Sequence, residues 1–438
     1  MNPVSPSTLS FFILLLAFRP THSRTCSTFD LFTAWCHRHG KTYSSDHEKL
    51  HRFRVFESNL NFINQHSLKG NSSYALALNS FADLTHDEFR ASKLGLLVGE
   101  IGDVGFDRRP DSNDGDGLGD VPASVDWRKS GAVTYVKDQK SCGACWAFTA
   151  TGAMEGINQI VTGSLVSLSE QELIDCDRRY NSGCEGGLMD YAYQFVVDNH
   201  GIDTEEDYPY LARDRTCNKD KLKHVAVTID GYADIPPRDE KQLLKGVAKQ
   251  PVSVGISGSD RAVQFYSKGI LTPPCSTSLD HAVLIVGYGS ENGMDYWIVK
   301  NSWGTDWGMK GYMHIQRNSG QPEGVCGINL LASYPVKTSP NPPPPPSPHP
   351  TKCDLFTSCG AGETCCCSWR LLGICFSWKC CELNAAVCCK DGQHCCPHDY
   401  PICNTRRNQC LKKSGNYTLI KKLKKSPGDE FNSFLWDL

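Results

Sequence analysis

The chain has 438 residues and a formal net charge of −3 at pH 7, so its charge gives no support to nucleic-acid binding. Its length predicts about two to four domains. Cysteine is the unusual feature, since 23 thiols in one chain fit an oxidising compartment better than the cytosol.

The N-terminus agrees with a secretory route. The apolar run Leu9–Phe18 is too short to cross a bilayer as a helix, so we interpret residues 1–23 as a signal peptide. No later apolar run is long enough to span a membrane, and Asn71 and Asn416 stand in N-glycosylation sequons. The mature protein is therefore expected in a vacuole or lysosome, or outside the cell, without stable membrane insertion.

Residues 24–120 combine a helix with a connector. The stretch "EKLHRFRVFESNLNFINQH" places Phe53, Phe56, Leu60 and Ile63 on one face of an amphipathic helix. The later stretch "VGEIGDVGFDRRPDSNDGDGLGDVP" is rich in glycine and aspartate with little apolar periodicity, which indicates a flexible, cleavable connector.

Beyond the connector the composition changes twice. Residues 121–337 mix helical and strand patterns and form the main domain. Residues 338–352 contain five consecutive prolines, which predict a polyproline II spacer. Residues 353–410 hold fourteen cysteines and read as a disulfide scaffold. The lysine-rich residues 411–438 are interpreted as a solvated tail that is trimmed during maturation.

The cysteine count of the main domain indicates one unpaired thiol. Seven cysteines lie between Cys142 and Cys326, and an odd number in a secreted chain leaves one thiol free. The pair Cys142 and Cys145 could be a redox couple, half of a zinc site, arms of two disulfides, or a nucleophile beside a structural cysteine.

Cys145 has a position that suits a nucleophile. Apolar residues recur at helical spacing through "CWAFTATGAMEGINQIVTG", and Gly163 is a good helix stop, so Cys145 is predicted to begin a helix. The helix dipole and the free amide groups of a first turn favour the reactive thiolate. Position alone fits an ordinary half-cystine equally well.

Other residues offer the remaining parts of a hydrolytic site. His281 stands where a buried strand begins and is the candidate base. Asn301 ends another apolar strand and could orient the imidazole, while Trp303 would shield that bond from water. Gln139 could donate to a developing oxyanion together with the Cys145 backbone N–H.

Four motifs, "QKSCGACWAF", "GCEGG", "LDHAVLIVGYG" and "KNSWGTDWG", resemble the papain family of cysteine proteases over residues 121–337. The resemblance implies an α+β fold with a helical lobe and a β-barrel-like lobe. The catalytic roles that it implies are Cys145 as nucleophile, His281 as general base and acid, Asn301 as orienter and Gln139 as oxyanion donor. Lys140 departs from the family, which usually has glycine there, and is expected at the rim of the site.

The resemblance also implies three disulfides. Their pairs are Cys142 with Cys184, Cys176 with Cys217, and Cys275 with Cys326. Cys145 then stays unpaired, as the odd count requires, so it has no partner for a redox couple. A zinc site is disfavoured as well, because no Cys or His group at ligand spacing completes it.

A set of substrate-binding residues follows from the same resemblance. Gly186 and Gly187 would pair with the substrate backbone, because glycine lets a peptide approach closely. The residues implied to line the pocket for the second residue before the scissile bond are Leu188, Met189, Gly255, Leu279, Ala282 and Leu331. This lining has no acidic residue, which predicts a preference for Leu, Val or Phe and little tolerance for Arg. Trp303 is added to this set, and Asp280 is expected to modulate the pH profile.

The N-terminal block resembles the inhibitory propeptide of the same family. The residues that match its spaced helical motif are Glu48, Arg52, Phe56, Asn59 and Ile63. Ser67 and Ala77 depart from the family pattern and are expected to soften the packing. The resemblance implies a zymogen cut near Asp120–Val121, with acid as the trigger because carboxylate–base pairs weaken as Asp and Glu are protonated. Cys26 and Cys36 could pair, although nothing in their spacing requires it.

The stretch "CCPHDYPICN" resembles a granulin domain, in the extended form fused to plant papain-like proteases. It implies a small disulfide-rich module of β-hairpins, whose connectivity the sequence does not define. Adjacent cysteines do not readily bond each other, so each doublet is expected to bond to flanking strands. The alternative is a metallothionein-like metal cluster, which the aromatic residues and the secretory route disfavour.

These patterns together predict a cysteine endopeptidase made as a zymogen, with neither cofactor nor metal. Its partners would be protein and peptide substrates, its own propeptide and cystatin-type inhibitors, and the chain is expected to be a monomer. A function of another class is a granulin module that acts as a growth-factor-like or interaction ligand released by the protease. A catalytically dead storage or decoy protein is disfavoured by the intact set of site residues.

Overall fold

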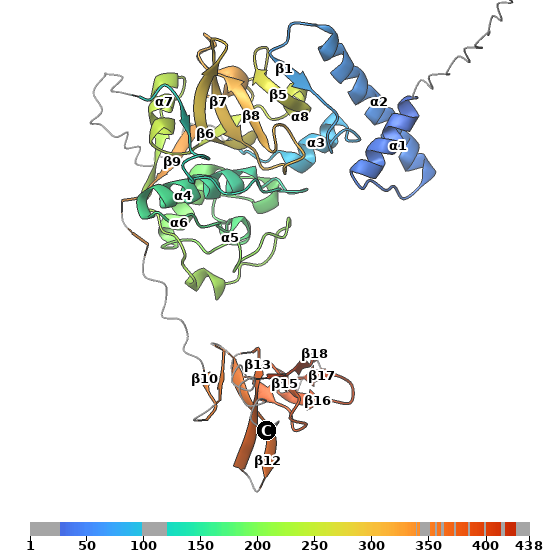
Figure 1. Cartoon of the computed structure of the whole chain (residues 1–438), viewed down its shortest axis with the longest axis vertical. Coiled ribbons are helices and arrows are strands. Elements are labelled where there is room, and N and C mark those ends of the chain that lie inside the picture. The colour runs from blue at the N-terminus through green and yellow to red at the C-terminus, as the bar shows by residue number, and fades with distance from the viewer. Residues whose placement is uncertain are drawn as a thin grey trace, which may run out of the picture. The chain divides into compact units, whose positions relative to one another are not determined.

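The computed structural model divides the chain into two compact units, Met1–Pro340 and Asn341–Leu438 (Figure 1). It describes residues 27–98, 121–338, 340–341 and 351–425, except 355–356, 361–362, 372–373, 384–385, 398–399 and 413–416. The predicted signal peptide, most of the connector, Cys26, Asn416 and the five prolines of the spacer lie outside the described residues. No helix in the described ranges combines the length and the apolar character that a membrane crossing needs.

The first unit begins with three helices, α1 (Thr28–Arg38), α2 (Asp46–Leu68) and α3 (His86–Lys93). Each follows a Ser or Thr whose hydroxyl accepts an N–H of the first turn, which satisfies a donor that a helix start leaves unpaired. Thr85 and Glu88 form a full capping box before α3. These caps explain why helices start within largely polar sequence.

The predicted apolar face of α2 is the face that packs. Phe56 and Ile63 are buried, and Phe53 and Leu60 are partly buried against the same core. Asn59 is also buried, and its amide donates to the carbonyl oxygens of Ala82 and Leu84. The helix is therefore tied by hydrogen bonds to the segment that precedes α3.

A nine-stranded sheet forms the centre of the first unit, in the order β1-β5-β8-β7-β6-β4-β9-β3, with β2 paired to β6. The strands are β1 (Tyr74–Leu76), β2 (Val125–Asp126), β3 (Gly231–Ile235), β4 (Val252–Ile256), β5 (Tyr266–Leu271), β6 (His281–Glu291), β7 (Met294–Lys300), β8 (Tyr312–Gln316) and β9 (Ala332–Val336). β1 comes from the N-terminal block and pairs antiparallel with β5. The N-terminal block thus adds an edge strand to the sheet of the main domain.

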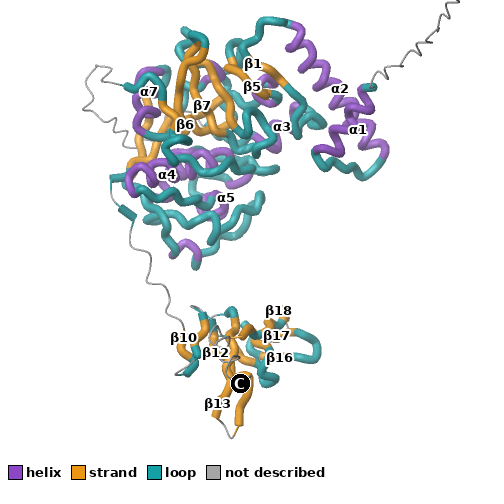
Figure 2. Tube along the Cα trace, in the orientation of Figure 1, coloured by secondary structure: helices purple, strands orange, loops and turns teal. Residues whose placement is uncertain are grey.

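Helices make the second layer of this unit. They are α4 (Cys145–Thr162), α5 (Glu170–Cys176), α6 (Met189–Asp198), α7 (Glu240–Lys249) and α8 (Arg261–Gln264), with short 3-10 helices η1 (Gly183–Glu185), η2 (Lys221–Lys223) and η3 (Val325–Gly327). Figure 2 shows α4 between the strands and α5. Every residue from Cys145 to Asn158 is buried, so α4 is packed on all sides, and its few polar residues, such as Glu155, are buried with it. The predicted α+β architecture with two lobes is confirmed.

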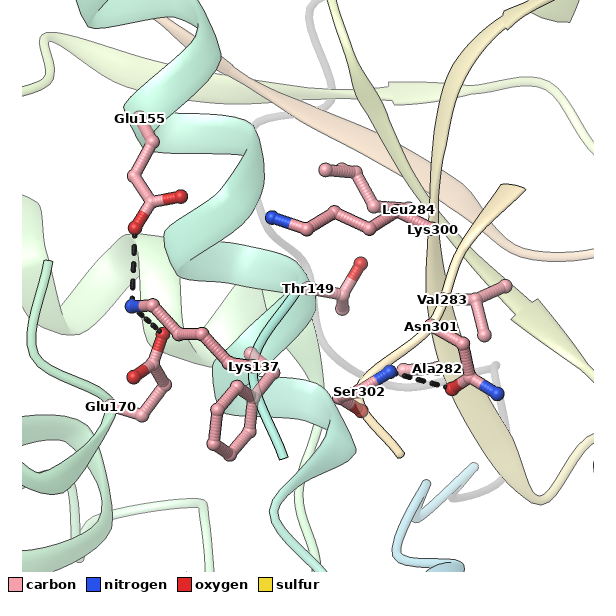
Figure 3. A pocket seen from close by; sticks show the side chains of 11 residues that line it. Lys137, Thr149, Glu155, Glu170, Ala282, Val283, Leu284, Lys300, Asn301 and Ser302 are labelled. Carbon is pink, nitrogen blue, oxygen red and sulfur yellow. Dashed lines mark hydrogen bonds and ion pairs between the residues drawn. The ribbon is translucent and has the colours of Figure 1, made fainter. Parts of the chain in front are cut away.

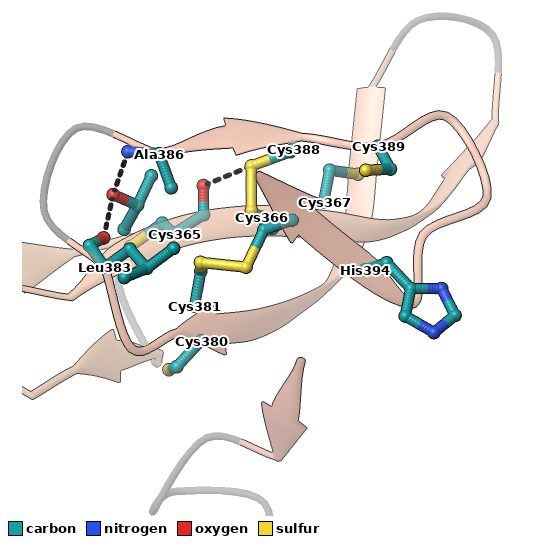
Figure 4. The surroundings of a disulfide bond; sticks show 12 residues. Cys365, Cys366, Cys367, Cys380, Cys381, Leu383, Ala386, Cys388, Cys389 and His394 are labelled. Carbon is teal, nitrogen blue, oxygen red and sulfur yellow. Dashed lines mark hydrogen bonds between the residues drawn. A yellow bond between two sulfur atoms is a disulfide. The ribbon is translucent and has the colours of Figure 1, made fainter. Parts of the chain in front are cut away.

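The second unit is built from short strands and disulfides. Its strands are β10 (Thr351–Lys352), β11 (Ser358–Cys359), β12 (Thr364–Leu371), β13 (Ile374–Cys381), β14 (Val387–Cys388), β15 (His394–Cys396), β16 (Ile402–Asn404), β17 (Gln409–Leu411), β18 (Tyr417–Leu419), β19 (Lys421–Lys422) and β20 (Lys424–Lys425). The seven disulfides join Cys353–Cys365, Cys359–Cys380, Cys366–Cys388, Cys367–Cys375, Cys381–Cys395, Cys389–Cys403 and Cys396–Cys410. Figure 4 shows the surroundings of the Cys366–Cys388 bond. The two members of each doublet bond different partners, as expected.

Part of the lysine-rich tail corrects a prediction. Residues 417–425 form β18, β19 and β20, which pair with β17, β15 and β13 of the module. Ile420 and Leu423 between these strands are buried. The interpretation of a solvated tail from residue 411 is therefore wrong for this stretch, because the lysines alternate with apolar residues that complete the small core.

Candidate active site

Cys145 is the first residue of α4, as the sequence predicts. Its thiol is free and fully buried, and the residue before it, Ala144, provides no side-chain cap. Backbone N–H groups of Trp146, Ala282 and Gly95 lie near the sulfur and act to lower its pKa, against the larger effect of burial. Donors of this kind stabilise a thiolate once the sulfur is opened to water.

The loop before Cys145 is anchored by a disulfide. Cys142 is bonded to Cys184, and the Gly143 N–H donates to the Cys184 carbonyl at 2.8 Å. The other two disulfides of the main domain join Cys176 to Cys217 and Cys275 to Cys326. Among the described residues, Cys36 and Cys145 stand outside disulfides, while the suggested partner of Cys36 lies outside the described ranges.

His281 begins β6 directly before Ala282, whose N–H faces the Cys145 sulfur. The Nε2 atom of His281 lies 2.8 Å from Oδ1 of Asn301, which also accepts the Ser302 N–H. Trp303 stacks on the imidazole at a centroid distance of 4.6 Å. The Nδ1 atom of His281 has no hydrogen-bond partner within the described ranges, so it is available to a thiol proton.

Gln139 is held from both ends of its side-chain amide. Its Oε1 accepts the Ser302 hydroxyl at 2.7 Å, and its Nε2 donates to the Cys142 carbonyl at 2.9 Å. The Tyr210 hydroxyl donates to its backbone carbonyl at 2.6 Å. The remaining donor capacity of Nε2 is directed at the carbonyl oxygen of Lys93, 3.1 Å away. A carbonyl of the N-terminal block therefore accepts the amide N–H that the sequence analysis assigns to an oxyanion.

The chain after α3 runs through the site in an extended form. The Gly187 N–H donates to the Gly95 carbonyl at 2.9 Å, and the Leu97 N–H donates to the Gly187 carbonyl at 3.0 Å. Leu96 and Gly187 thus form a parallel bridge. The carbonyl of Asp280 accepts the N–H groups of Gly95 and Leu96 from the other side. The N-terminal block occupies the cleft by backbone pairing.

Leu96 fills an apolar pocket. A Cβ added at Gly255 would lie 2.9 Å from Cδ2 of Leu96, 3.1 Å from Leu279 and 3.3 Å from Leu331. The structure thus brings together these three residues of the predicted pocket. The others, Leu188, Met189 and Ala282, belong to the same apolar cluster as Leu96.

Two glycines face the extended segment closely. A Cβ at Gly186 would lie 2.8 Å from the Gly95 carbonyl oxygen, and one at Gly187 would lie 2.4 Å from Oδ1 of Asn181. Either side chain would displace the paired segment or the wall behind it. Trp303 lies apart from this pocket, where Phe81 and Phe89 pack edge-on against its ring at 5.7 and 5.2 Å.

Burial controls the charge of the two candidate reactive groups. Desolvation raises the pKa of the Cys145 thiol to about 12. Desolvation also lowers the pKa of His281 to about 4, against the opposing effect of the hydrogen bond to Asn301. With the cleft covered, thiol and imidazole are both neutral at intermediate pH, and the sulfur is a poor nucleophile.

A buried charge cluster supports the strand that carries Asn301 (Figure 3). Lys137 lies 2.6 Å from Glu170 and 3.2 Å from Glu155, so one ammonium links two helices. Lys300, the residue before Asn301, donates to the Thr134 hydroxyl at 3.0 Å beside a cavity of about 20 Å³, which has room for one water. Desolvation lowers the pKa of Lys300 to about 8. This cluster joins the helical lobe to the sheet directly behind the site.

Lys140 is exposed close to the site, where the sequence analysis expects it, and Asp280 lies directly before His281. Lys140 has φ +54°, a left-handed backbone conformation that favours glycine. This conformation explains why the family usually has glycine at this position. Its exposed side chain pairs with Asp138 at 2.7 Å, and its carbonyl accepts Nζ of Lys93 at 2.6 Å. The Asp280 carboxylate accepts the N–H of Gly258 at 2.7 Å. Its effect on the pH profile stays a prediction.

Some residues at the site carry no signal that sequence reasoning used. The carbonyl of Lys93 and the side chain of Leu96 lie in the cleft. Phe81 and Phe89 cover Trp303. The apolar character of "KLGLLV", which begins at the last residue of α3, is the one pattern that could have indicated Leu96. The polar residues Lys137, Glu155 and Glu170 stand in otherwise apolar patterns, so sequence reasoning gives no sign that they form a buried cluster.

Three family models match the chain in sequence order. The cathepsin propeptide inhibitor domain (I29) matches residues 32–89, the papain family cysteine protease matches 121–336, and granulin matches 357–411. The chain is 50% identical over 411 residues to "Probable cysteine protease RD21B" of Arabidopsis thaliana, which covers 92% of this chain and 88% of that protein. It is 45% identical over 426 residues to "Oryzain beta chain" of Oryza sativa subsp. japonica, which covers 93% and 90%.

The chain belongs to the papain family of cysteine proteases.

Solved proforms of this family have the same arrangement. A recombinant stem bromelain precursor superposes with a TM-score of 0.65 at 38% identity, over 71% of this chain and 99% of that one. The proform of the ragweed pollen allergen Amb a 11 gives a TM-score of 0.65 at 42% identity, over 72% and 95%. The papain-family protease described here is thus a zymogen whose propeptide lies in the cleft of its own catalytic domain, with a granulin module after it.

Proposed function

We propose that the matured protein is an endopeptidase that uses Cys145, His281, Asn301 and Gln139. The observation that carries this proposal is the line of contacts from the Cys145 sulfur through the start of β6 to the 2.8 Å hydrogen bond between His281 and Asn301. A free thiol at a helix start, an imidazole beside it and an amide that holds the ring are the parts that nucleophilic catalysis by cysteine needs.

The steps follow from these positions. The Cys145 sulfur attacks the peptide carbonyl as its proton passes to His281, and the Cys145 N–H and the Gln139 amide donate to the oxyanion. His281 then gives the proton to the leaving amine, which leaves an acyl-enzyme. Water attacks this thioester with His281 as base, and the thiol is restored. Asn301 accepts from Nε2 of His281, which fixes the ring orientation and leaves Nδ1 free to take the thiol proton.

The pocket of Leu96 should select the second residue before the scissile bond. We expect the matured enzyme to cleave a peptide with Leu there about 100-fold more efficiently, by kcat/KM, than a matched peptide with Arg, because an unpaired guanidinium would be buried among apolar atoms. Gly255→Ala should lower kcat/KM for Leu by about tenfold and spare a peptide with Val, because the added methyl shortens the pocket. Equal kcat/KM for the Leu and Arg peptides would contradict this assignment.

Acid release of the propeptide is proposed to depend on Glu88. Its carboxylate accepts from Arg52 at 2.7 Å and from the Thr85 N–H at 2.9 Å, so it joins α2 to the start of α3. The hydrogen bond from Arg52 lowers the pKa of Glu88 from 4.5 to about 2. A carboxylate whose pKa is depressed in the folded state stabilises the fold at pH values above its ordinary pKa of 4.5. This stabilisation is lost as the pH falls from 4.5 toward 2.

Glu88→Gln should therefore make maturation less dependent on acid. We expect the variant to mature at a pH where the wild-type zymogen stays intact, because an uncharged amide forms no ion pair with Arg52 at any pH. The rate of conversion to the mature enzyme is followed on gels across a pH series. Asp87→Asn is the matched control, since Asp87 is an exposed acid in the same turn, and its profile should follow the wild type. If the maturation rate of Glu88→Gln depends on pH as that of the wild type does, Glu88 does not control release of the propeptide.

The cellular setting is part of the proposal. The ten disulfides of the described residues favour folding in the secretory pathway, followed by a vacuolar, lysosomal or extracellular site of action. Asn71 is exposed directly after α2, which suits N-glycosylation. We propose a monomeric enzyme that cystatin-type proteins inhibit at the same cleft, since that cleft already accepts an extended segment of its own chain.

A further inference from the structure

The granulin module presents large apolar side chains at one end of the β12–β13 ribbon. Trp369 is 56% exposed, Leu371 51%, Ile374 62% and Phe376 57%, and we name these four residues the apolar finger. Figure 1 shows the ribbon extending past the other strands of the module. Contiguous apolar surface of this kind, rimmed by polar residues, marks an interaction site.

The apolar finger is a fixed structure. The two strands pair from Thr364 opposite Cys381 to Leu371 opposite Ile374, with register shifts on either side of Trp369, and the Cys367–Cys375 disulfide joins them next to the tip. The rings of Trp369 and Phe376 lie 5.4 Å apart. Because the strands are already ordered, little conformational entropy is lost when the finger meets a partner.

The charged side chains within the ribbon are positive. In residues 364–381 they are Arg370 and Lys379. β20 pairs with β13 at the base of the ribbon, where Lys424 forms an ion pair with Glu382. The finger therefore combines exposed apolar side chains and an aromatic pair with Arg370 among them and Lys379 nearer the base.

We propose that the apolar finger docks the granulin module on a lipid surface rich in anionic headgroups. Trp and Phe side chains enter the interfacial region of a bilayer readily, and basic residues behind them are attracted to anionic headgroups. The ribbon that carries the finger extends past the other strands of the module, so its shape suits insertion into a soft surface (Figure 1). This activity goes beyond proteolysis and would localise the protease through its granulin module.

The test is co-sedimentation of the full chain with vesicles. The chain carries Cys145→Ala so that it does not remove its own module, and the vesicles are phosphatidylcholine with or without phosphatidylserine. We expect sedimentation with the anionic vesicles and an affinity that falls about tenfold or more in the double variant Trp369→Ser and Phe376→Ser. The matched control is Ile402→Ser with Leu419→Ser, because both residues are exposed and apolar on other strands of the module.

A second variant separates charge from apolar insertion. Arg370→Gln with Lys379→Gln should weaken binding to the anionic vesicles and leave any binding to phosphatidylcholine unchanged. Mass spectrometry without reduction verifies that each variant keeps the seven disulfides of the module. The proposal is overturned if the parent chain does not sediment with vesicles, if the finger variant sediments like the parent, or if the control variant loses binding equally. Self-association without lipid that the finger variant abolishes would assign the finger to a second copy of the chain instead.

Discussion

Cys145→Ala is expected to abolish peptide hydrolysis and self-maturation together. The sulfur is the atom that forms the acyl-enzyme, and removal of a covalent nucleophile lowers kcat by roughly 10⁵-fold or more. The loss should appear in kcat with a fluorogenic peptide after the propeptide has been removed by an added protease. The variant zymogen should also stay intact at acid pH, because no active neighbour is present to cut it.

Cys36→Ala is the matched control for this result. Cys36 is the other free cysteine of the described residues and lies half-buried in α1, beside the Tyr43 hydroxyl. Its variant should mature and turn over like the wild type, because it contacts neither the cleft nor the imidazole. Activity that survives in Cys145→Ala, or that disappears equally in Cys36→Ala, would remove Cys145 from the mechanism.

Gly95→Ala is expected to weaken latency of the zymogen. A Cβ at Gly95 would lie 2.0 Å from the Gly143 carbonyl oxygen, which is a backbone atom next to the site and cannot turn away. The segment would have to rise from the cleft, which breaks its pairing with Gly187 and withdraws Leu96 from its pocket. Loss of a buried leucine and two or three hydrogen bonds should raise the activity of the uncleaved zymogen by roughly 100-fold or more.

The measurement is hydrolysis of a small peptide by uncleaved zymogen at neutral pH. Leu68→Ala is the control, because Leu68 is 85% exposed at the end of α2 and leaves the cleft contacts intact. Latency of Gly95→Ala equal to that of the wild type would show that the propeptide inhibits without filling the cleft.

The sequence predicted that Cys145 begins a helix, that His281 begins a strand and that Asn301 stands at the end of one, because each stands at the end of a strongly patterned element. Gln139 lies in the loop before α4, and its role follows from the resemblance. Periodicity identifies α4 and the strands β6 and β7, and their ends bring these side chains to one place. The two-lobed fold and the family of the chain, both confirmed, follow instead from the resemblance of four separated motifs to the papain family. The roles of the four residues stay proposals, which the variants above test.

Contacts between distant segments could not be predicted in this way. Neither the backbone pairing of Leu96 with Gly187 nor the parallel direction of that pairing has a periodic signature. The buried link from Lys137 to Glu155 and Glu170 depends on three charges that only the tertiary fold brings together. The frequent lysines of residues 417–425 indicate a solvated tail. The strands there are anchored by two apolar residues, Ile420 and Leu423, which are too few to form a recognisable pattern.

The central claim is that Cys145 and His281 are both neutral in the zymogen and become reactive when the propeptide is released. Labelling with a thiol-reactive peptidyl epoxide tests this claim most directly. Wild-type zymogen, acid-matured enzyme and uncleaved Gly95→Ala zymogen are treated side by side, and the labelled peptide is located by mass spectrometry. We predict label on Cys145 in the matured enzyme and in Gly95→Ala, and little on Cys145 in the wild-type zymogen. Equal labelling of Cys145 in the wild-type zymogen, or label on another cysteine of the matured enzyme, would contradict the account.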